Sequence, residues 1–190
     1  VTRGARDMYS RESVMRGRAE LKRAHEIVGI SHCHFLDFPA PKLDSVPNHR
    51  IADSIKKVLS LVRPQILYLP HRGDIHVDHR AVYYATLVAA RPTRDMPVDK
   101  LLCYETLSEP DWAPPSAEDA FVPTVFVDVS PYIETKLKAM ECYKSELKER
   151  PHPRTIEALR ALARFRGSTV GFESAEAFML VRDRIPWNDI

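Results

Sequence analysis

The sequence predicts an α/β fold in which helices cover both faces of a mostly parallel sheet. Short apolar runs alternate along the chain with segments whose apolar residues recur at helical spacing. Such alternation favours parallel pairing, because each crossover helix packs on a face of the sheet. The length of 190 residues and the hydrophobic content of 44% are sufficient for one domain with its own core.

The first part of the chain is predicted to contain two helices. Residues 1–4 resemble the end of a strand that runs into a loop. A helical stripe then extends from Ser10 to Ile30, where Gly29 is placed to end it. The other elements expected in this part are a short strand at 34–36, a loop at 38–48 that holds three prolines, and an amphipathic helix at 51–62 that ends before Pro64.

The remaining elements alternate in the same way. They are a strand at 66–69, a helix from Val77, a strand at 101–106, a proline-rich loop at 107–123, a strand at 124–129, helices from Ser130 and near 153–165, and a final strand at 178–181. Ser130 and Pro131 suit the N-cap and the first position of the helix that they begin.

The most informative segment lies between the strand at 66–69 and the helix from Val77. Imidazole and carboxylate groups, the ligand set of Zn²⁺ and related divalent metals, are concentrated there. Open α/β sheets bind their ligands at the carboxyl ends of the strands, where this segment begins. A solvated loop with a helix-capping histidine is the alternative interpretation. The residues are His71, Asp74, His76, Asp78 and His79.

The spacing within this cluster suggests separate roles. His76 and His79 can face one pocket if His79 lies in the first helical turn, so that one binds a metal and the other polarises a substrate carbonyl or protonates a leaving group. Asp78 suits the role of fixing a histidine's tautomer and orientation. His71 and Asp74 could be ligands, orienting residues or loop-forming residues. Catalytic zinc usually has three protein ligands, so at least one more is expected from elsewhere.

Composition argues against several other classes of protein. The net charge is +2, and there is no basic tail or aromatic stripe of a nucleic-acid-binding protein. No apolar run approaches the roughly 20 residues that a membrane span needs, and no signal-peptide pattern is seen. Cys33, Cys103 and Cys142 are isolated, which favours a cytoplasmic protein with reduced thiols. The oligomeric state stays open, and a homo-oligomer is one of the options.

The cluster resembles the second signature of the PIG-L/LmbE family of zinc-dependent de-N-acetylases, a histidine, a spaced aspartate and then H-x-D-H. The resemblance runs through nearly the whole chain, and it implies a Rossmann-like three-layer α/β/α sandwich that forms a single deacetylase domain over residues 1–190. The supporting segments are Val1-Thr-Arg-Gly4, Arg18-Ala-Glu20, Phe126-Val-Asp128-Val129, Tyr143-Lys-Ser145 and Ala175-Glu176-Ala177-Phe178.

The resemblance also implies roles for individual residues. His79 corresponds to a metal ligand, His76 to the histidine that stabilises the oxyanion or serves as acid, and Asp78 to the aspartate that supports the site. The family's first signature, A-H-P-D-D-E, supplies two further ligands and the general base, but it is absent from this sequence. We expect it upstream of Val1, so the chain is expected to be N-terminally truncated, to lack its first strand and to be inactive by itself. Candidate substrate contacts are Arg3, His71, Asp74 and Trp112.

The implied function is hydrolysis by a zinc-dependent enzyme that acts on a small molecule. The enzyme would remove the acetyl group from an N-acetylated amino sugar of the N-acetylglucosamine type, or from its conjugate, and the loop with Trp112 would form a wall of the substrate site. Two alternatives stay open. One is another metal-dependent hydrolase, such as a phosphoesterase, because the same ligands serve phosphate chemistry. The other is a sugar-binding domain without catalytic activity.

Overall fold

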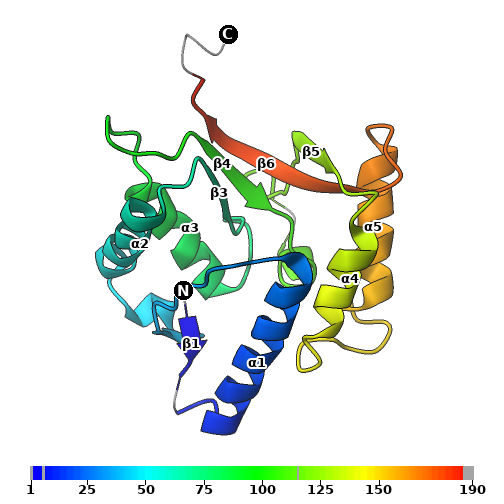
Figure 1. The fold of residues 1–190 in the computed structure, drawn as a ribbon, viewed down its shortest axis with the longest axis horizontal. Coiled ribbons are helices and arrows are strands. Elements are labelled where there is room, and N and C mark those ends of the chain that lie inside the picture. The colour runs from blue at the N-terminus through cyan, green and yellow to red at the C-terminus, as the bar shows by residue number, and fades with distance from the viewer. Residues whose placement is uncertain (1, 6, 115, 186–190) are drawn as a thin grey trace. The chain divides into compact units, whose positions relative to one another are not determined.

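The computed structural model describes residues 2–5, 7–114 and 116–185. It is a mixed α/β protein, as the sequence predicts (Figure 1). The chain divides into two compact units. The first comprises Val1–Arg3, His34–Val125 and Phe178–Ile190, and the second comprises Gly4–Cys33 and Phe126–Ala177. The single domain over residues 1–190 stays a prediction, and we describe each unit by itself.

Two helices of the first unit begin and end where local sequence signals place them. Helix α2 (Asn48–Val62) ends at Arg63, which adopts a left-handed conformation directly before Pro64. Helix α3 (Val77–Ala89) follows its N-cap residue, His76. Both helices contribute to a buried apolar core with the strands of this unit. Members of that core are Leu43, Ile51, Leu59, Leu69, Ala85 and Leu101.

The sheet of the first unit is mixed rather than mostly parallel. Strand β3 (Ile66–Leu69) pairs in parallel with β4 (Lys100–Tyr104), so that Leu69 lies opposite Cys103. On its other side β4 pairs antiparallel with residues 178–183 of β6 (Ala175–Asp183). Because β3 and β4 run in the same direction, the loops that follow them leave from the same edge of the sheet. The predicted cluster at residues 71–79 follows β3 at this edge.

The second unit is built mainly from helices. Helix α1 (Arg11–Val28) is capped by the side chain of Ser10 and ends at Gly29, as predicted. Helices α4 (Ile133–Glu141) and α5 (Ile156–Ser168) pack through a small apolar cluster. The buried Glu20 of α1 accepts hydrogen bonds from the backbone and hydroxyl of Ser145, at 3.2 and 2.6 Å. Strand β5 (Val125–Asp128) is the neighbour of β6 in the strand order.

One predicted strand is misplaced. Residues 34–36 are irregular, whereas β2 (Phe38–Ala40) lies in the segment that was predicted as a loop. It pairs with β1 (Thr2–Gly4) in a two-stranded sheet. Pro39 is compatible with this arrangement, because each strand of a two-stranded sheet keeps a free edge on which no N–H is required. The short 3₁₀ helix η1 (Leu43–Ser45) follows.

The predicted start of α4 is also wrong. The helix begins at Ile133 with Tyr132 as its N-cap. The hydroxyl of Ser130 instead donates to Asp128 and accepts the N–H of Ser174 at 3.1 Å, so it joins two segments of the second unit rather than capping a helix. A serine hydroxyl satisfies either role, and the sequence does not show that Ser174 is nearby.

Candidate active site

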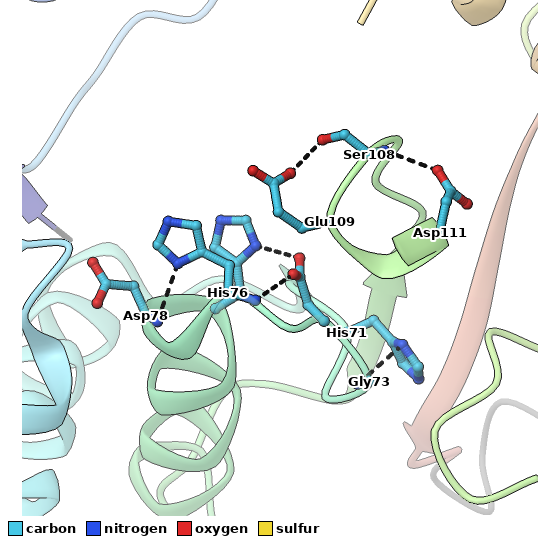
Figure 2. Close-up of polar contacts among 9 residues, drawn as sticks. His71, Gly73, His76, Asp78, Ser108, Glu109 and Asp111 are labelled. Carbon is cyan, nitrogen blue, oxygen red and sulfur yellow. Dashed lines mark hydrogen bonds and ion pairs between the residues drawn. The ribbon is translucent and has the colours of Figure 1, made fainter. Parts of the chain in front are cut away.

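The predicted cluster occupies the turn from β3 to α3 in the first unit (Figure 2). His76 is the N-cap of α3, and His79 lies in the first turn of that helix. Asp74 and Asp78 are buried, with exposed fractions of 1% and 5%. The strand end and the helix start therefore bring imidazoles and carboxylates together as the sequence spacing predicts.

His76 and His79 form a stacked pair that Asp74 holds in place. Their ring centroids are 4.6 Å apart, and the ring planes are inclined by 17°. One carboxylate oxygen of Asp74 lies 2.5 Å from Nδ1 of His79. The other oxygen accepts the backbone N–H of His76 at 2.8 Å. A single buried carboxylate thus fixes the ring of one histidine and the backbone of the other.

These hydrogen bonds give the two imidazoles opposite chemical character. Nδ1 of His79 donates to the Asp74 carboxylate, which leaves the lone pair of His79 on Nε2. Nδ1 of His76 accepts the backbone N–H of Asp78 at 3.2 Å, so its proton resides on Nε2. Neighbouring rings therefore present a lone pair and a hydrogen-bond donor. This combination suits a ligand or proton acceptor beside a group that stabilises negative charge.

Asp78 has a different role from the one expected. We expected its carboxylate to orient a histidine, but that carboxylate accepts the backbone N–H of Leu43 at 2.9 Å. The hydrogen bond from Asp78 to His76 comes from the backbone nitrogen. Asp78 therefore ties the start of α3 to η1, and the carboxylate that orients an imidazole is that of Asp74.

His71 is packed inside the protein rather than presented to a ligand. Its side chain has 4% exposure, its ring meets Phe121 edge-on, and its Nδ1 accepts the N–H of Gly73 at 3.2 Å. Burial, with a smaller contribution from the charge of Arg72, lowers the pKa of His71. Its Nε2 is buried without a hydrogen-bond partner among the described residues. Figure 2 shows the ring of His71 turned towards Gly73 rather than His76.

Gly73 allows a distant segment to pack on this loop. A Cβ atom at this position would lie 2.0 Å from the carbonyl oxygen of Asp119, so every larger residue would force the two segments apart. The side chain of Arg72 also donates to the carbonyl oxygen of Glu118. Residues 118–121 therefore clamp residues 71–73, which fixes the backbone that precedes Asp74.

The other expected substrate contacts lie in varied surroundings. Asp74 is buried and engaged with both histidines, so its carboxylate faces the protein and not a substrate. Arg3 is half-buried and donates from Nε to the carbonyl oxygen of Asp37 at 3.3 Å. Trp112 is 54% exposed in the 3₁₀ helix η2 (Pro110–Trp112). Substrate contacts by Arg3 and Trp112 stay predictions.

The loop after β4 contributes residues that the sequence analysis missed. Ser108 is fully buried at a φ of 97°, which is unusual for a residue with a side chain. Its N–H donates to Asp111 at 2.8 Å, and its hydroxyl donates to the carboxylate of Glu109. Figure 2 shows this turn across from His76. A signal was present in the sequence, because Ser-Glu-Pro-Asp begins four residues after the end of β4, but its polar residues are typical of any loop.

The described residues supply one clear position for a metal ligand. No three His, Cys, Asp or Glu side chains of the described part of the chain are grouped so that they could hold a metal ion. His79 fits a ligand position, because its Nδ1 is hydrogen-bonded to a buried carboxylate as in most metal-binding histidines. That further ligands come from elsewhere stays a prediction.

Comparison with known proteins identifies the family of this segment. The model of the PIG-L family, described as GlcNAc-PI de-N-acetylase, matches residues 1–90, which include the whole cluster. Residues 1–90 belong to the PIG-L family. The family expected from the H-x-D-H element and its surroundings is therefore confirmed.

Two relatives of this chain carry deacetylase names. The uncharacterized deacetylase YaiS of Escherichia coli (strain K12) is 30% identical over 135 residues, which are 66% of this chain and 64% of that protein. The diacetylchitobiose deacetylase of Thermococcus kodakarensis is 26% identical over 180 residues, which are 92% of this chain and 66% of that protein. The chain thus spans slightly less than two thirds of the length of each relative.

A solved structure shows that the fold is shared. The conserved protein TT1542 from Thermus thermophilus superimposes with a TM-score of 0.74, over 98% of this chain and 83% of that one. The two sequences are 24% identical, so this likeness bears on the fold alone. It confirms the predicted α/β class.

Proposed function

We propose that this chain is part of a metal-dependent hydrolase that removes the acetyl group from an N-acetylated amino sugar or its conjugate. The observation that carries the proposal is the stacked pair of His76 and His79, whose hydrogen bonds fix a donor and a lone pair side by side. The deacetylase names of the two relatives, one of them for a protein that acts on diacetylchitobiose, support this reaction class.

The hydrogen bonds of the cluster support a separate role for each residue in amide hydrolysis. Nε2–H of His76 donates a hydrogen bond to the oxygen of the acetamide carbonyl, which becomes negatively charged as the tetrahedral intermediate forms. Nε2 of His79 would occupy one ligand position of a divalent metal, which we expect to be zinc. When bound, such a metal lowers the pKa of a water molecule and polarises a carbonyl group. Asp74 keeps the His79 lone pair on Nε2 throughout.

A product assay on the full-length protein tests this proposal. We expect release of free acetate from an N-acetylglucosamine-type substrate, and no inorganic phosphate from a sugar phosphate. Release of phosphate without acetate would establish the phosphoesterase alternative. Saturable binding of the sugar with neither product would instead indicate a sugar-binding domain that lacks catalytic activity.

Replacing Asp74 by Asn should weaken metal binding about 10–100-fold, a typical effect of removing the partner of a metal-bound histidine. The amide of Asn can turn either its N–H groups or its oxygen towards Nδ1 of His79. It therefore accommodates both tautomers of the imidazole, whereas the carboxylate of Asp74 enforces one. Competition titration with a chelating dye measures this affinity. Asp78→Asn is the matched control, because its amide oxygen can still accept the N–H of Leu43. Equal affinities for the two variants would contradict the role assigned to Asp74.

The proposed partner is a small amino-sugar substrate, and we place the protein in the cytoplasm. None of the helices in the described part of the chain has the length and apolar character of a membrane span. Cys33, Cys103 and Cys142 are free thiols, which suits a reducing compartment. Burial raises the pKa of the Cys103 thiol to about 11, so this cysteine is chemically inert. A homo-oligomer and the lack of nucleic-acid binding stay predictions.

A further inference from the structure

The loop after β4 emerges beside the stacked histidines. Strands β3 and β4 are parallel neighbours with Leu69 opposite Cys103, so the segments that follow them start at the same edge of the sheet. Tyr104, the last residue of β4, lies within electrostatic range of Asp74. Burial raises the pKa of the Tyr104 hydroxyl, and the charge of Asp74 raises it further. Residues just beyond Tyr104 are therefore placed to meet a ligand that approaches His76.

Hydrogen bonds stabilise a strained turn at Ser108 in this loop. Ser108 has a positive φ although it is not glycine, and such strained conformations are concentrated at binding and catalytic sites. The hydrogen bond from its N–H to Asp111 maintains the turn, and its hydroxyl holds the carboxylate of Glu109. Figure 2 shows the side chain of Glu109 directed to the side of the turn on which His76 lies.

We propose that Glu109 is a substrate-binding residue, whose carboxylate accepts hydrogen bonds from hydroxyl groups of the amino sugar that lies at His76. This inference rests on the proposed function and narrows its substrate class. Glu109 is half-buried, so its negative charge is only partly screened by solvent. A phosphate group at this position would be repelled. The preferred ligand is therefore a sugar that carries free hydroxyl groups, and no phosphate, at the ring positions next to the N-acetyl group.

Two substitutions at Glu109 separate the carboxylate's hydrogen bonds from its charge. Glu109→Ala removes both, and we expect the Kd for N-acetylglucosamine, measured by titration calorimetry on the full-length protein, to rise about tenfold or more. Glu109→Gln keeps an acceptor oxygen for the Ser108 hydroxyl. We expect it to weaken binding less, and to improve the affinity for N-acetylglucosamine 1-phosphate, whose phosphate is next to the N-acetyl-bearing carbon, relative to the neutral sugar. Glu141→Gln, at an exposed end of α4, is the matched control.

Binding and turnover distinguish failure of this inference from failure of the proposed function. An unchanged Kd in Glu109→Ala would overturn the inference, whether or not acetate is released. A fall in kcat accompanied by a lower Tm and an unchanged Kd would also overturn it, because Glu109 would then act only through the stability of its turn. Wild-type protein that binds the sugar through Glu109 but releases no acetate would uphold the inference and refute the deacetylase activity.

Discussion

Replacement of His76 by Ala in the full-length protein should lower kcat by about 10²–10³ while the metal content stays unchanged. Its Nε2–H is the proposed donor to the oxyanion, because Nδ1 accepts the backbone N–H of Asp78. A donor that acts on charge developed in the transition state has an effect of this size on kcat. Steady-state kinetics and elemental analysis on one preparation measure both quantities.

A second substitution removes the effect of helix capping from this result. His76 is also the N-cap of α3, and loss of a cap typically costs about 1 kcal/mol of stability. His76→Asn keeps a capping side chain without the imidazole, and should lose as much activity as His76→Ala. His49→Ala, at an exposed position in α2, should behave as wild type. If His76→Ala loses zinc but keeps a near-normal kcat, His76 is a metal ligand instead. If both its kcat and its zinc content are normal, His76 is only a capping residue.

The sequence predicts the site's framework well because the signals that position it are local. The apolar run of β3 and the stripe of α3 fix both ends of the segment, and the observed bounds of β3 agree with those predicted. The three-residue spacing of His76 and His79 then follows from the start of the helix. No long-range information is needed to bring these two imidazoles together.

The assignment of the carboxylates could not be read in the same way. Asp78 stands between the histidines in the sequence, yet its side chain is directed to Leu43, 35 residues earlier. Asp74 reaches both histidines because residues 118–121 clamp the loop that precedes it. Contacts over such separations leave no periodic pattern. The position of Ser108 and Glu109 near the histidines is hidden for the same reason, since it depends on the pairing of β4 with β3.

The direction of β6 shows a further limit. Alternation of strands and helices favours a parallel sheet, but it does not fix which strand lies beside which. The chain reaches β6 through α4 and α5, and β6 pairs antiparallel with β4. The same pattern of apolar residues is compatible with parallel and antiparallel pairing, because side chains alternate between the two faces of the sheet in both cases.

Replacement of His79 by Ala should remove nearly all bound metal from the full-length protein. Its Nε2 is the one nitrogen of the cluster that combines a free lone pair with a buried carboxylate on the opposite ring edge. Elemental analysis after dialysis measures the metal content, and circular dichroism shows whether the variant is folded. The side chain is 33% exposed, so its removal leaves no large cavity and should cost little stability. Full metal content in a folded variant would refute the assignment.

A double substitution tests whether Asp74 acts through His79. If its carboxylate serves only to orient that imidazole, Asp74→Asn should weaken metal binding in the wild-type background and have almost no further effect when His79 is already Ala. The same dye competition measures the residual affinity of all three variants. Additive losses would mean that Asp74 affects the metal by another route. One such route is through His76, whose backbone N–H donates a hydrogen bond to the second oxygen of the Asp74 carboxylate.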